Sequence, residues 1–174
     1  VWSFLSTGIK TKYTIDDEVI GQGKFAKVKA ATSKKDGQKY AVKIIQKKNC
    51  TSDQARLELE LTIMKKVDHP NCIKFHEMYQ SKQKMYIVME LVTGGELFDR
   101  IVQKDHYTEM EAANCCSQLL KAVEYLHSMD IVHRDIKPEN VLYATRSMDS
   151  PIKLADFGLG KILDDHDEMM KTMC

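Results

Sequence analysis

The sequence lacks the features that define several special classes of protein. It has three prolines and eight glycines among 174 residues, and no apolar run approaches the roughly 18 residues of a membrane span. Its five cysteines are odd in number and show no metal-ligand spacing, which favours reduced thiols over a disulfide framework. We therefore expect a globular protein of a reducing compartment, located in the cytoplasm, with the nucleus left open.

The net charge of +1 gives no general attraction to nucleic acid or to an anionic membrane, and we expect neither as a partner. The charge is nevertheless divided unevenly along the chain. Residues 1–89 contain 17 basic and 9 acidic side chains, a net charge of +8, whereas residues 90–174 contain 9 and 16, a net charge of −7. Strand-like patterns also give way to helical ones near residues 89–95, so we predict a boundary there.

The first half is predicted to form an antiparallel sheet. Short β-type runs at 13–20, 28–31 and 40–45 are separated by glycine-containing turns, and two more runs follow at 72–78 and 84–92. Residues 52–67 fit a strand by the alternation of leucines and a helix by the spacing of Leu57, Leu61, Met64 and Val67. Their length and polar flanks favour a helix, which residues 68–71 end. The pattern therefore indicates five strands and one helix.

The second half is predicted to be mainly helical. Residues 96–104 form a short helix, and residues 108–129 a long one that starts with a Thr108/Glu111 capping box. A hairpin-like region follows from 131 to 155. The apolar stripe expected along the long helix consists of Ala112, Cys116, Leu119, Val123 and Leu126.

A glycine-rich segment, Gly21-Gln22-Gly23-Lys24-Phe25-Ala26-Lys27-Val28, lies between two predicted strands. Because it precedes a strand and not a helix, it is neither a Rossmann turn nor a P-loop. Two interpretations stay open: ordinary turn chemistry, or a backbone that can approach phosphate oxygens closely.

Lys43 lies inside an apolar strand and needs either a route to the sheet edge or an anionic partner. Glu60 shares a helix face with Leu57 and Met64, so its carboxylate points with the apolar stripe. A solvated glutamate is the alternative, and only the coincidence with Lys43 favours a pair.

The segment from His133 to Asn140, followed by Asp156-Phe157-Gly158, concentrates reactive side chains. Asp135, Lys137 and Asn140 lie within six residues, and Asp156 arrives from a second turn. Together they offer a base, a counter-cation for phosphate and two oxygen-type metal ligands. Phosphoryl transfer requires these parts, because its catalysis is mostly positioning and charge neutralisation.

On these motifs the chain resembles the eukaryotic protein kinases from about residue 13 to residue 174. Residues 92–101 and 140–143 are most similar to the calcium/calmodulin-dependent group of serine/threonine kinases. The resemblance implies an α+β, bilobal fold with an N-terminal extension (1–12), an ATP-binding N-lobe (13–89), a hinge (90–95) and a partial C-lobe (96–174). We expect the chain to be a fragment that stops inside the activation segment, and residues 1–174 alone to be weakly folded or inactive.

The implied activity is transfer of the γ-phosphoryl group of Mg-ATP to a serine or threonine hydroxyl of a protein. A pseudokinase or nucleotide-binding scaffold is the alternative, especially for the isolated fragment, and a small-molecule kinase of related fold is a third, disfavoured reading. ATP contacts are implied for Ile20, Gly21, Gln22, Gly23, Lys24, Phe25, Ala26, Lys27, Val28, Ala41, Lys43, Glu90, Val92, Glu96 and Leu142. Met89 would be the gatekeeper residue.

The resemblance also implies individual roles. Asp135 would accept the substrate proton, Lys137 would steady the γ-phosphate, Asn140 and Asp156 would bind Mg²⁺, and Glu60 would position Lys43. A spine of stacked side chains is implied for four residues: Met64, Phe75, His133 and Phe157.

Substrate and control are implied in the same way. Glu96 and Glu139 would read basic residues upstream of the phosphorylated one, so a basic protein substrate is expected. Thr172 would carry an activating phosphate that Arg134 orders. Calmodulin is an implied partner through a segment outside this sequence. Ala26 stands where the family's loop pattern has its third glycine. The resemblance implies that this position tolerates a small residue, so ATP binding is little affected.

Overall fold

The computed structural model of the chain describes residues 8–23, 26–47, 54–157 and 161–162. The chain divides into two compact units. Unit 1 comprises the described residues of Val1–Gln54 and Lys74–Val92, and unit 2 comprises those of Ala55–Ile73 and Thr93–Cys174. No helix in the described ranges is long and apolar enough to cross a membrane.

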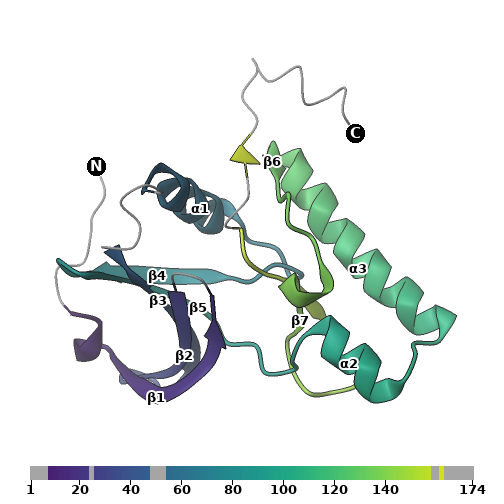
Figure 1. Cartoon of the computed structure of the whole chain (residues 1–174), viewed down its shortest axis with the longest axis horizontal. Helices are drawn as coiled ribbons and strands as arrows, with labels where there is room; N and C mark the ends of the chain where they lie inside the picture. The colour runs from purple at the N-terminus through teal and green to yellow at the C-terminus, as the bar shows by residue number, and fades with distance from the viewer. Residues whose placement is uncertain (1–7, 24–25, 48–53, 158–160, 163–174) are drawn as a thin grey trace. The chain divides into compact units, whose positions relative to one another are not determined.

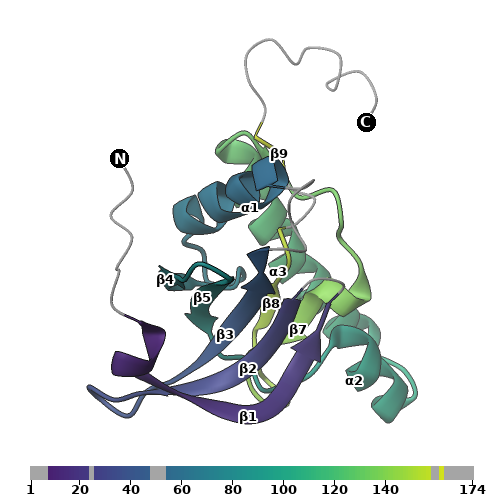
Figure 2. The same cartoon turned by 60° about the vertical axis from the view of Figure 1, so that its left-hand side comes forward.

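Unit 1 is a five-stranded antiparallel sheet preceded by one turn of 3₁₀ helix (Figure 2). Its strands lie in the order β1-β2-β3-β5-β4, so three consecutive strands are followed by a hairpin that places β5 beside β3. This confirms the predicted sheet. The elements are η1 (Ile9–Thr11), β1 (Tyr13–Gln22), β2 (Ala26–Ser33), β3 (Lys39–Gln46), β4 (Phe75–Gln80) and β5 (Lys84–Glu90).

The register gives the two faces of this sheet different characters. Val28 on β2 pairs with Lys43 on β3, which pairs with Ile87 on β5, so these side chains share one face. Two residues before Lys43 on β3, Ala41 pairs with Met89 and lies on the same face. The opposite face carries the hydrophobic core of the unit, in which the buried residues are Ile9, Tyr13, Ala31, Val42, Tyr79 and Val88.

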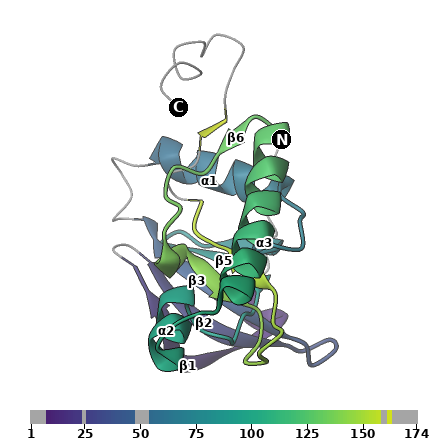
Figure 3. The same cartoon turned by 90° about the vertical axis from the view of Figure 1, so that its right-hand side faces the viewer.

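Unit 2 contains the helices and two short antiparallel strand pairs (Figures 1 and 3). Strand β6 pairs with β9, and β7 pairs with β8, which confirms a hairpin within the predicted region 131–155. The elements are α1 (Gln54–Lys66), α2 (Leu97–Lys104), α3 (Glu109–Ser128), β6 (Ile131–Val132), η3 (Pro138–Asn140), β7 (Val141–Tyr143), β8 (Ile152–Leu154) and β9 (Lys161–Ile162).

Helix α3 begins with the predicted capping box. The Thr108 hydroxyl accepts a hydrogen bond from the Glu111 N–H at 3.3 Å, and the Glu111 carboxylate accepts one from the Thr108 N–H at 3.0 Å. Two of the N–H groups at the helix start are thereby satisfied within the segment itself, so a local sequence signal suffices to fix this helix start.

The apolar stripe predicted for α3 is wrong at two positions. Ala112 and Cys116 are exposed, whereas the buried residues of the helix are Cys115, Ala122 and Leu126. Small and apolar side chains occupy neighbouring faces of α3, so more than one stripe satisfies helical spacing and the sequence alone does not choose between them. Cys115 and Cys116 are both free thiols, as the cysteine count predicts.

The segment after α1 is fastened to α3 and β8, all within unit 2. The Tyr125 hydroxyl accepts a hydrogen bond from the Asp68 N–H at 2.9 Å, and the Tyr125 ring stacks on His69 with centroids 5.0 Å apart. The buried Asn71 amide donates to Gln118 Oε1 at 2.9 Å and to a β8 carbonyl at 3.0 Å. Residues 68–71 therefore do more than end a helix, which is all that the sequence indicated.

This attachment also corrects the start of the fourth predicted strand. Cys72 forms an isolated parallel bridge with Leu154 of β8, and the Ile73 N–H donates to the Leu154 carbonyl at 3.0 Å. The strand predicted from residue 72 therefore begins only at Phe75, because the backbone of residues 71–73 pairs with β8 instead.

Candidate active site

The loop between β6 and β7 carries the reactive segment, and backbone pairing fixes where Asp156 emerges. Strand β8 runs antiparallel to β7, and the Ala155 N–H donates to the Asn140 carbonyl at 2.8 Å. The Ala155 carbonyl in turn bonds His133 Nε2 at 3.1 Å. Asp156 therefore follows β8 directly beside the loop of residues 133–140, which carries Asp135, Lys137 and Asn140.

Asp135 is the centre of the hydrogen bonding in this loop. Its carboxylate accepts from Lys137 Nζ at 3.2 Å on Oδ1, and the same ammonium lies 3.1 Å from Oδ2. Asn140 Nδ2 donates to the Asp135 carbonyl at 2.7 Å and to Oδ2 at 2.9 Å. The bonds from Lys137 and Asn140 lower the pKa of Asp135, so the group is a carboxylate at neutral pH. Its side chain stays 24% exposed, which leaves it accessible to a substrate.

His133 supports this carboxylate from the buried side of the loop. The imidazole is 2% exposed, and burial lowers its pKa, so the ring is neutral. Its Nδ1 accepts a hydrogen bond from the Asp135 N–H at 3.3 Å, which assigns the ring proton to Nε2, the atom facing the Ala155 carbonyl. The ring also contacts buried Phe157, with centroids 5.1 Å apart, as the spine expectation requires. The Met64 and Phe75 part of that spine stays a prediction.

Two residues of the site have backbones in the left-handed region. Arg134 has φ of 61° and Asp156 has φ of 62°, conformations that side chains other than glycine rarely adopt. Such positions concentrate at functional sites, where surrounding contacts hold them. Arg134 is exposed, and its predicted partner Thr172 lies outside the described residues.

The donor atoms of Asn140 and Asp156 fit Mg²⁺. Both hydrogen bonds of the Asn140 amide nitrogen go to Asp135, which orients the amide so that its oxygen remains an acceptor. In the described ranges, no three His, Cys, Asp or Glu side chains gather into a possible metal site. A pair of oxygen ligands is nevertheless the pattern suited to Mg²⁺, which keeps several waters and takes further ligands from substrate phosphates.

The predicted nucleotide residues of unit 1 lie along neighbouring strands. Gly21 pairs with Val28, which pairs with Lys43, and the Gly23 N–H donates to the Ala26 carbonyl at 2.9 Å. Ile20, Gln22 and Lys27 are exposed, Val28 and Lys43 are half-buried, and Ala41 is buried. Lys24 and Phe25 lie outside the described residues.

Glu60 is 8% exposed, on the same buried side of α1 as Met64. The carboxylate therefore does lie with the apolar residues of the helix, as its spacing indicates. Lys43 belongs to unit 1 and Glu60 to unit 2, and their pairing stays a prediction.

The end of the predicted hinge joins β7 through backbone hydrogen bonds. The Gly94 N–H donates to the Tyr143 carbonyl, and the Tyr143 N–H donates to the Gly95 carbonyl, each at 2.9 Å. Glu96 then forms an antiparallel bridge with Leu142, which brings two of the predicted site residues together. In unit 1, Glu90 and Val92 are half-buried, and the Glu90 N–H is bonded to the Lys74 carbonyl at 2.9 Å. Glu139 is exposed on η3.

Gly94 is a supporting residue that sequence reasoning missed. A Cβ built on it would lie 2.2 Å from the Thr145 carbonyl oxygen and 2.6 Å from that of Tyr143, so only glycine permits this approach. In the sequence, Gly94 stands in a Gly94-Gly95 pair directly after the predicted strand 84–92, where glycine is consistent with a simple strand end.

Comparison with known proteins decides the family. The family model for the protein kinase domain matches residues 14–174. The chain belongs to the protein kinase family. Relatives place it among the eukaryotic serine/threonine kinases of the calcium/calmodulin-dependent group. A probable myosin light chain kinase of Dictyostelium discoideum is 54% identical over 155 residues, which are 89% of this chain and 48% of that protein.

Calcium/calmodulin-dependent protein kinase type 1 of Caenorhabditis briggsae is 48% identical over 170 residues, covering 97% of this chain and 47% of the relative. Calcium/calmodulin-dependent protein kinase type IV of Homo sapiens is 46% identical over 155 residues, which are 89% of this chain and 32% of that protein. The crystal structure of Rad53 residues 1–466 with AMP-PNP matches with a TM-score of 0.84 and 38% identity, over 87% of this chain and 40% of that one. This kinase chain thus spans about half, or less, of the length of these relatives.

Proposed function

We propose that this chain carries the nucleotide-binding and catalytic residues of a serine/threonine protein kinase, which transfers the γ-phosphoryl group of Mg-ATP to a protein hydroxyl. The observation that carries the proposal is the Asp135–Lys137–Asn140 cluster. It holds an ionised, partly exposed carboxylate beside a cation and an amide, within a loop that buried His133 supports. Phosphoryl transfer needs this combination of groups.

Asp135 is suited to orient the attacking hydroxyl and to take its proton. Asn140 donates to both the carbonyl and the carboxylate of Asp135, so the carboxylate has a fixed direction before substrate binds. Its lowered pKa makes it a weak base, which suits a transfer in which the proton leaves the hydroxyl late. Lys137, whose pKa is raised by Asp135, keeps its positive charge and can contact the transferred phosphoryl oxygens.

The geometry of the glycine-rich turn favours the phosphate interpretation over turn chemistry. Neither Gly21 nor Gly23 has a positive φ. Among the residues that the structure describes, a Cβ at Gly21 would meet Val28 at an ordinary 3.5 Å, and one at Gly23 would meet only the Ala26 carbonyl oxygen, at 3.9 Å. The described neighbours therefore do not require glycine at either position, whereas close approach of a phosphate does. The AMP-PNP in the Rad53 structure further supports nucleotide binding by this chain.

Asn140 and Asp156 are the residues that would hold Mg²⁺, whose charge, when the ion is bound, stabilises phosphate oxygens. Glu60 would orient Lys43 toward the α- and β-phosphates. For the substrate, exposed Glu139 and half-buried Glu96 provide carboxylates for basic residues upstream of the phosphorylated one. The names of the relatives support control by calcium and calmodulin, through a segment outside residues 1–174. We also propose that Thr172 carries an activating phosphate, which would pair with Arg134 and order its side chain. The proposed location is the cytoplasm, with the nucleus left open.

The test is a phosphotransfer assay on the full-length protein with radiolabelled ATP and an arginine-containing serine peptide. Asp135→Asn should lower the rate by about 10²–10⁴-fold, the usual contribution of a positioned base, while binding of a fluorescent ATP analogue changes little. Asp149→Asn is the matched control, because Asp149 is an exposed aspartate of the β7–β8 loop, and its rate should be unchanged.

Nucleotide binding by the wild-type protein without transfer to any peptide would contradict the proposal and favour the pseudokinase alternative. Full activity of Asp135→Asn would contradict the role of Asp135. Phosphorylation of small alcohols in preference to the peptide would instead favour a small-molecule kinase.

A further inference from the structure

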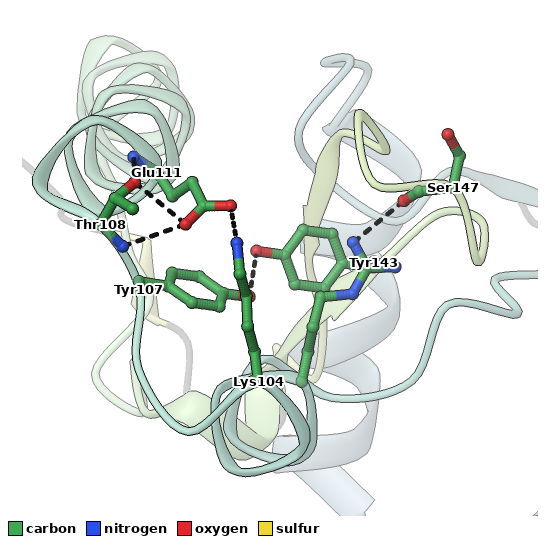
Figure 4. Close-up of polar contacts among 7 residues, drawn as sticks. Lys104, Tyr107, Thr108, Glu111, Tyr143 and Ser147 are labelled. Carbon is green, nitrogen blue, oxygen red and sulfur yellow. Dashed lines mark hydrogen bonds and ion pairs between the residues drawn. The ribbon is translucent and has the colours of Figure 1, made fainter.

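Unit 2 contains a groove of about 680 Å³ that the proposed phosphotransfer chemistry does not use. It lies among α2, α3 and the loop that joins β7 to β8, and we call it the α2–α3 groove (Figure 4). Its lining contains none of the four residues assigned to phosphotransfer in unit 2, which are Asp135, Lys137, Asn140 and Asp156. Its volume falls within the range of roughly 300–1,000 Å³ that is typical of ligand sites.

Contacts between its walls hold the α2–α3 groove in a fixed shape. Arg100 on α2 donates to the Thr145 carbonyl at 3.1 Å and to the Ser147 carbonyl at 3.0 Å, and its guanidinium lies 3.8 Å from the centroid of the Tyr143 ring. The hydroxyls of Tyr107 and Tyr143 are hydrogen-bonded at 2.9 Å (Figure 4). Helix α2 and the β7–β8 loop are therefore fixed to each other before any ligand binds, which lowers the ordering cost of binding.

The groove is positively charged in a half of the chain that is acidic. Its charged lining residues are Arg100, Lys104, Arg146 and Glu111, which sum to +2, whereas residues 90–174 together carry −7. Lys104 is neutralised by its ion pair with Glu111. The bonds of Arg100 go to uncharged carbonyls, and exposed Arg146 makes no hydrogen bond or ion pair to any other residue that the structure describes. Two cations are thus left without a counter-charge.

The positions of these cations indicate the form of the ligand. Arg100 lies on α2 and Arg146 lies on the β7–β8 loop, so the two cations come from different walls of the groove and suit a ligand with more than one carboxylate. Apolar surface lies among them, because the Tyr107 ring is half-buried and Met148 is 69% exposed at the groove. Methionine side chains adapt readily to apolar partners.

We propose that the α2–α3 groove binds a short acidic peptide segment of a partner protein, with its carboxylates toward Arg100 and Arg146 and an apolar side chain beside Met148 and Tyr107. This site goes beyond the phosphotransfer activity and does not depend on it, because its lining contains none of the residues assigned to ATP or to catalysis.

Fluorescence anisotropy on the full-length protein tests the proposal without any activity readout. The probe is a fluorescein-labelled octapeptide of alternating glutamate and leucine, compared with the same peptide carrying glutamine in place of glutamate. The acidic probe should bind, and its affinity should fall with rising salt. The glutamine peptide should bind at least tenfold more weakly.

Variants locate the binding. Arg146→Glu should weaken the acidic probe at least tenfold, whereas Arg146→Lys should weaken it less than threefold, because the charge is kept. Lys82→Glu makes the same reversal at an exposed lysine of the β4–β5 turn and should change the affinity less than twofold.

Arg146 makes no hydrogen bond or ion pair with another described residue, so its variants should keep the circular dichroism spectrum and unfolding midpoint of the wild type. Absence of binding, as when another segment of the protein occupies the groove, would overturn the proposal. Equal losses in Arg146→Glu and Lys82→Glu, or equal binding of both peptides, would overturn it as well.

Discussion

Gly94 offers the sharpest test of how the hinge end is joined to β7. Alanine at this position would place its Cβ 2.2 Å from the Thr145 carbonyl oxygen, 2.5 Å from the Tyr143 Cβ and 2.6 Å from the Tyr143 carbonyl oxygen. Two of these three atoms are backbone, so no side chain can rotate away to relieve the clash. Either the hinge end or the β7–β8 hairpin must shift.

The cost follows from the contacts that such a shift would break. Overpacking of a filled site costs about 1–3 kcal/mol. The three backbone hydrogen bonds at risk are Thr93 N–H to the Ala144 carbonyl at 3.0 Å and the two between Tyr143 and Gly94 or Gly95 at 2.9 Å. Each is worth about 1 kcal/mol net. We therefore expect Gly94→Ala to lower the free energy of unfolding by about 3–5 kcal/mol, allowing for partial relaxation.

Two other glycines separate this steric effect from backbone conformation. Gly95 has φ of 78°, and no atom of a described residue lies within 4 Å of a built Cβ. Gly95→Ala should therefore cost only the left-handed penalty of about 1–2 kcal/mol. Gly8 has an ordinary φ of −59°, and no described residue lies within 4 Å of a built Cβ, so Gly8→Ala should be nearly neutral. Urea unfolding of the full-length protein measures all three. A loss in Gly94→Ala no larger than that in Gly95→Ala would refute the steric argument.

Two further predictions concern α3. Asn71→Ala removes a part-buried hydrogen bond to Gln118 and a buried one to a β8 carbonyl, and should cost about 2–3 kcal/mol in urea unfolding. Asn114→Ala loses one exposed bond and should cost under about 1 kcal/mol. Equal losses would contradict the anchoring role. Bonds from Lys104, and then from the Thr108 cap, lower the pKa of Glu111 to about 2, so its stabilising effect is present above pH 4.5 and is lost as pH falls toward 2. NMR titration of the Glu111 carboxyl should show this midpoint, and Lys104→Met should move it toward 4.5; an unchanged midpoint in that variant would contradict the assigned cause.

The predictions that succeeded rest on signals contained within a short stretch of chain. The capping box of α3 needs only Thr108 and Glu111, three residues apart, and the strands of unit 1 follow from alternation and turn residues. The reactive loop was recognisable because Asp135, Lys137 and Asn140 are close in sequence, and their side chains do bond one another.

The features that could not be predicted from the sequence depend on contacts between residues far apart in the chain. Asn71 is held by Gln118 and by β8, which lie 47 and 81 residues away, and nothing near Asn71 announces either partner. Likewise, β4 begins at Phe75 and not at the predicted residue 72, because Cys72 pairs with Leu154 of β8. Arg100 likewise resembles any solvated helix arginine until the β7–β8 loop places two carbonyls against it.

Gly94 and Gly21 show how the structure distinguishes a glycine required by packing from one that packing does not require. In the sequence, Gly94 and Gly21 are equivalent, since each lies at the end of a strand next to a polar turn. In the structure, a side chain at Gly94 collides with backbone at 2.2 Å, whereas one at Gly21 meets Val28 at an ordinary 3.5 Å. The fold itself therefore explains glycine at position 94 and leaves glycine at position 21 unexplained. Close approach of a nucleotide phosphate, as proposed above, would supply the missing reason. On that proposal Gly21→Ala should weaken binding of the ATP analogue while leaving the unfolding midpoint nearly unchanged.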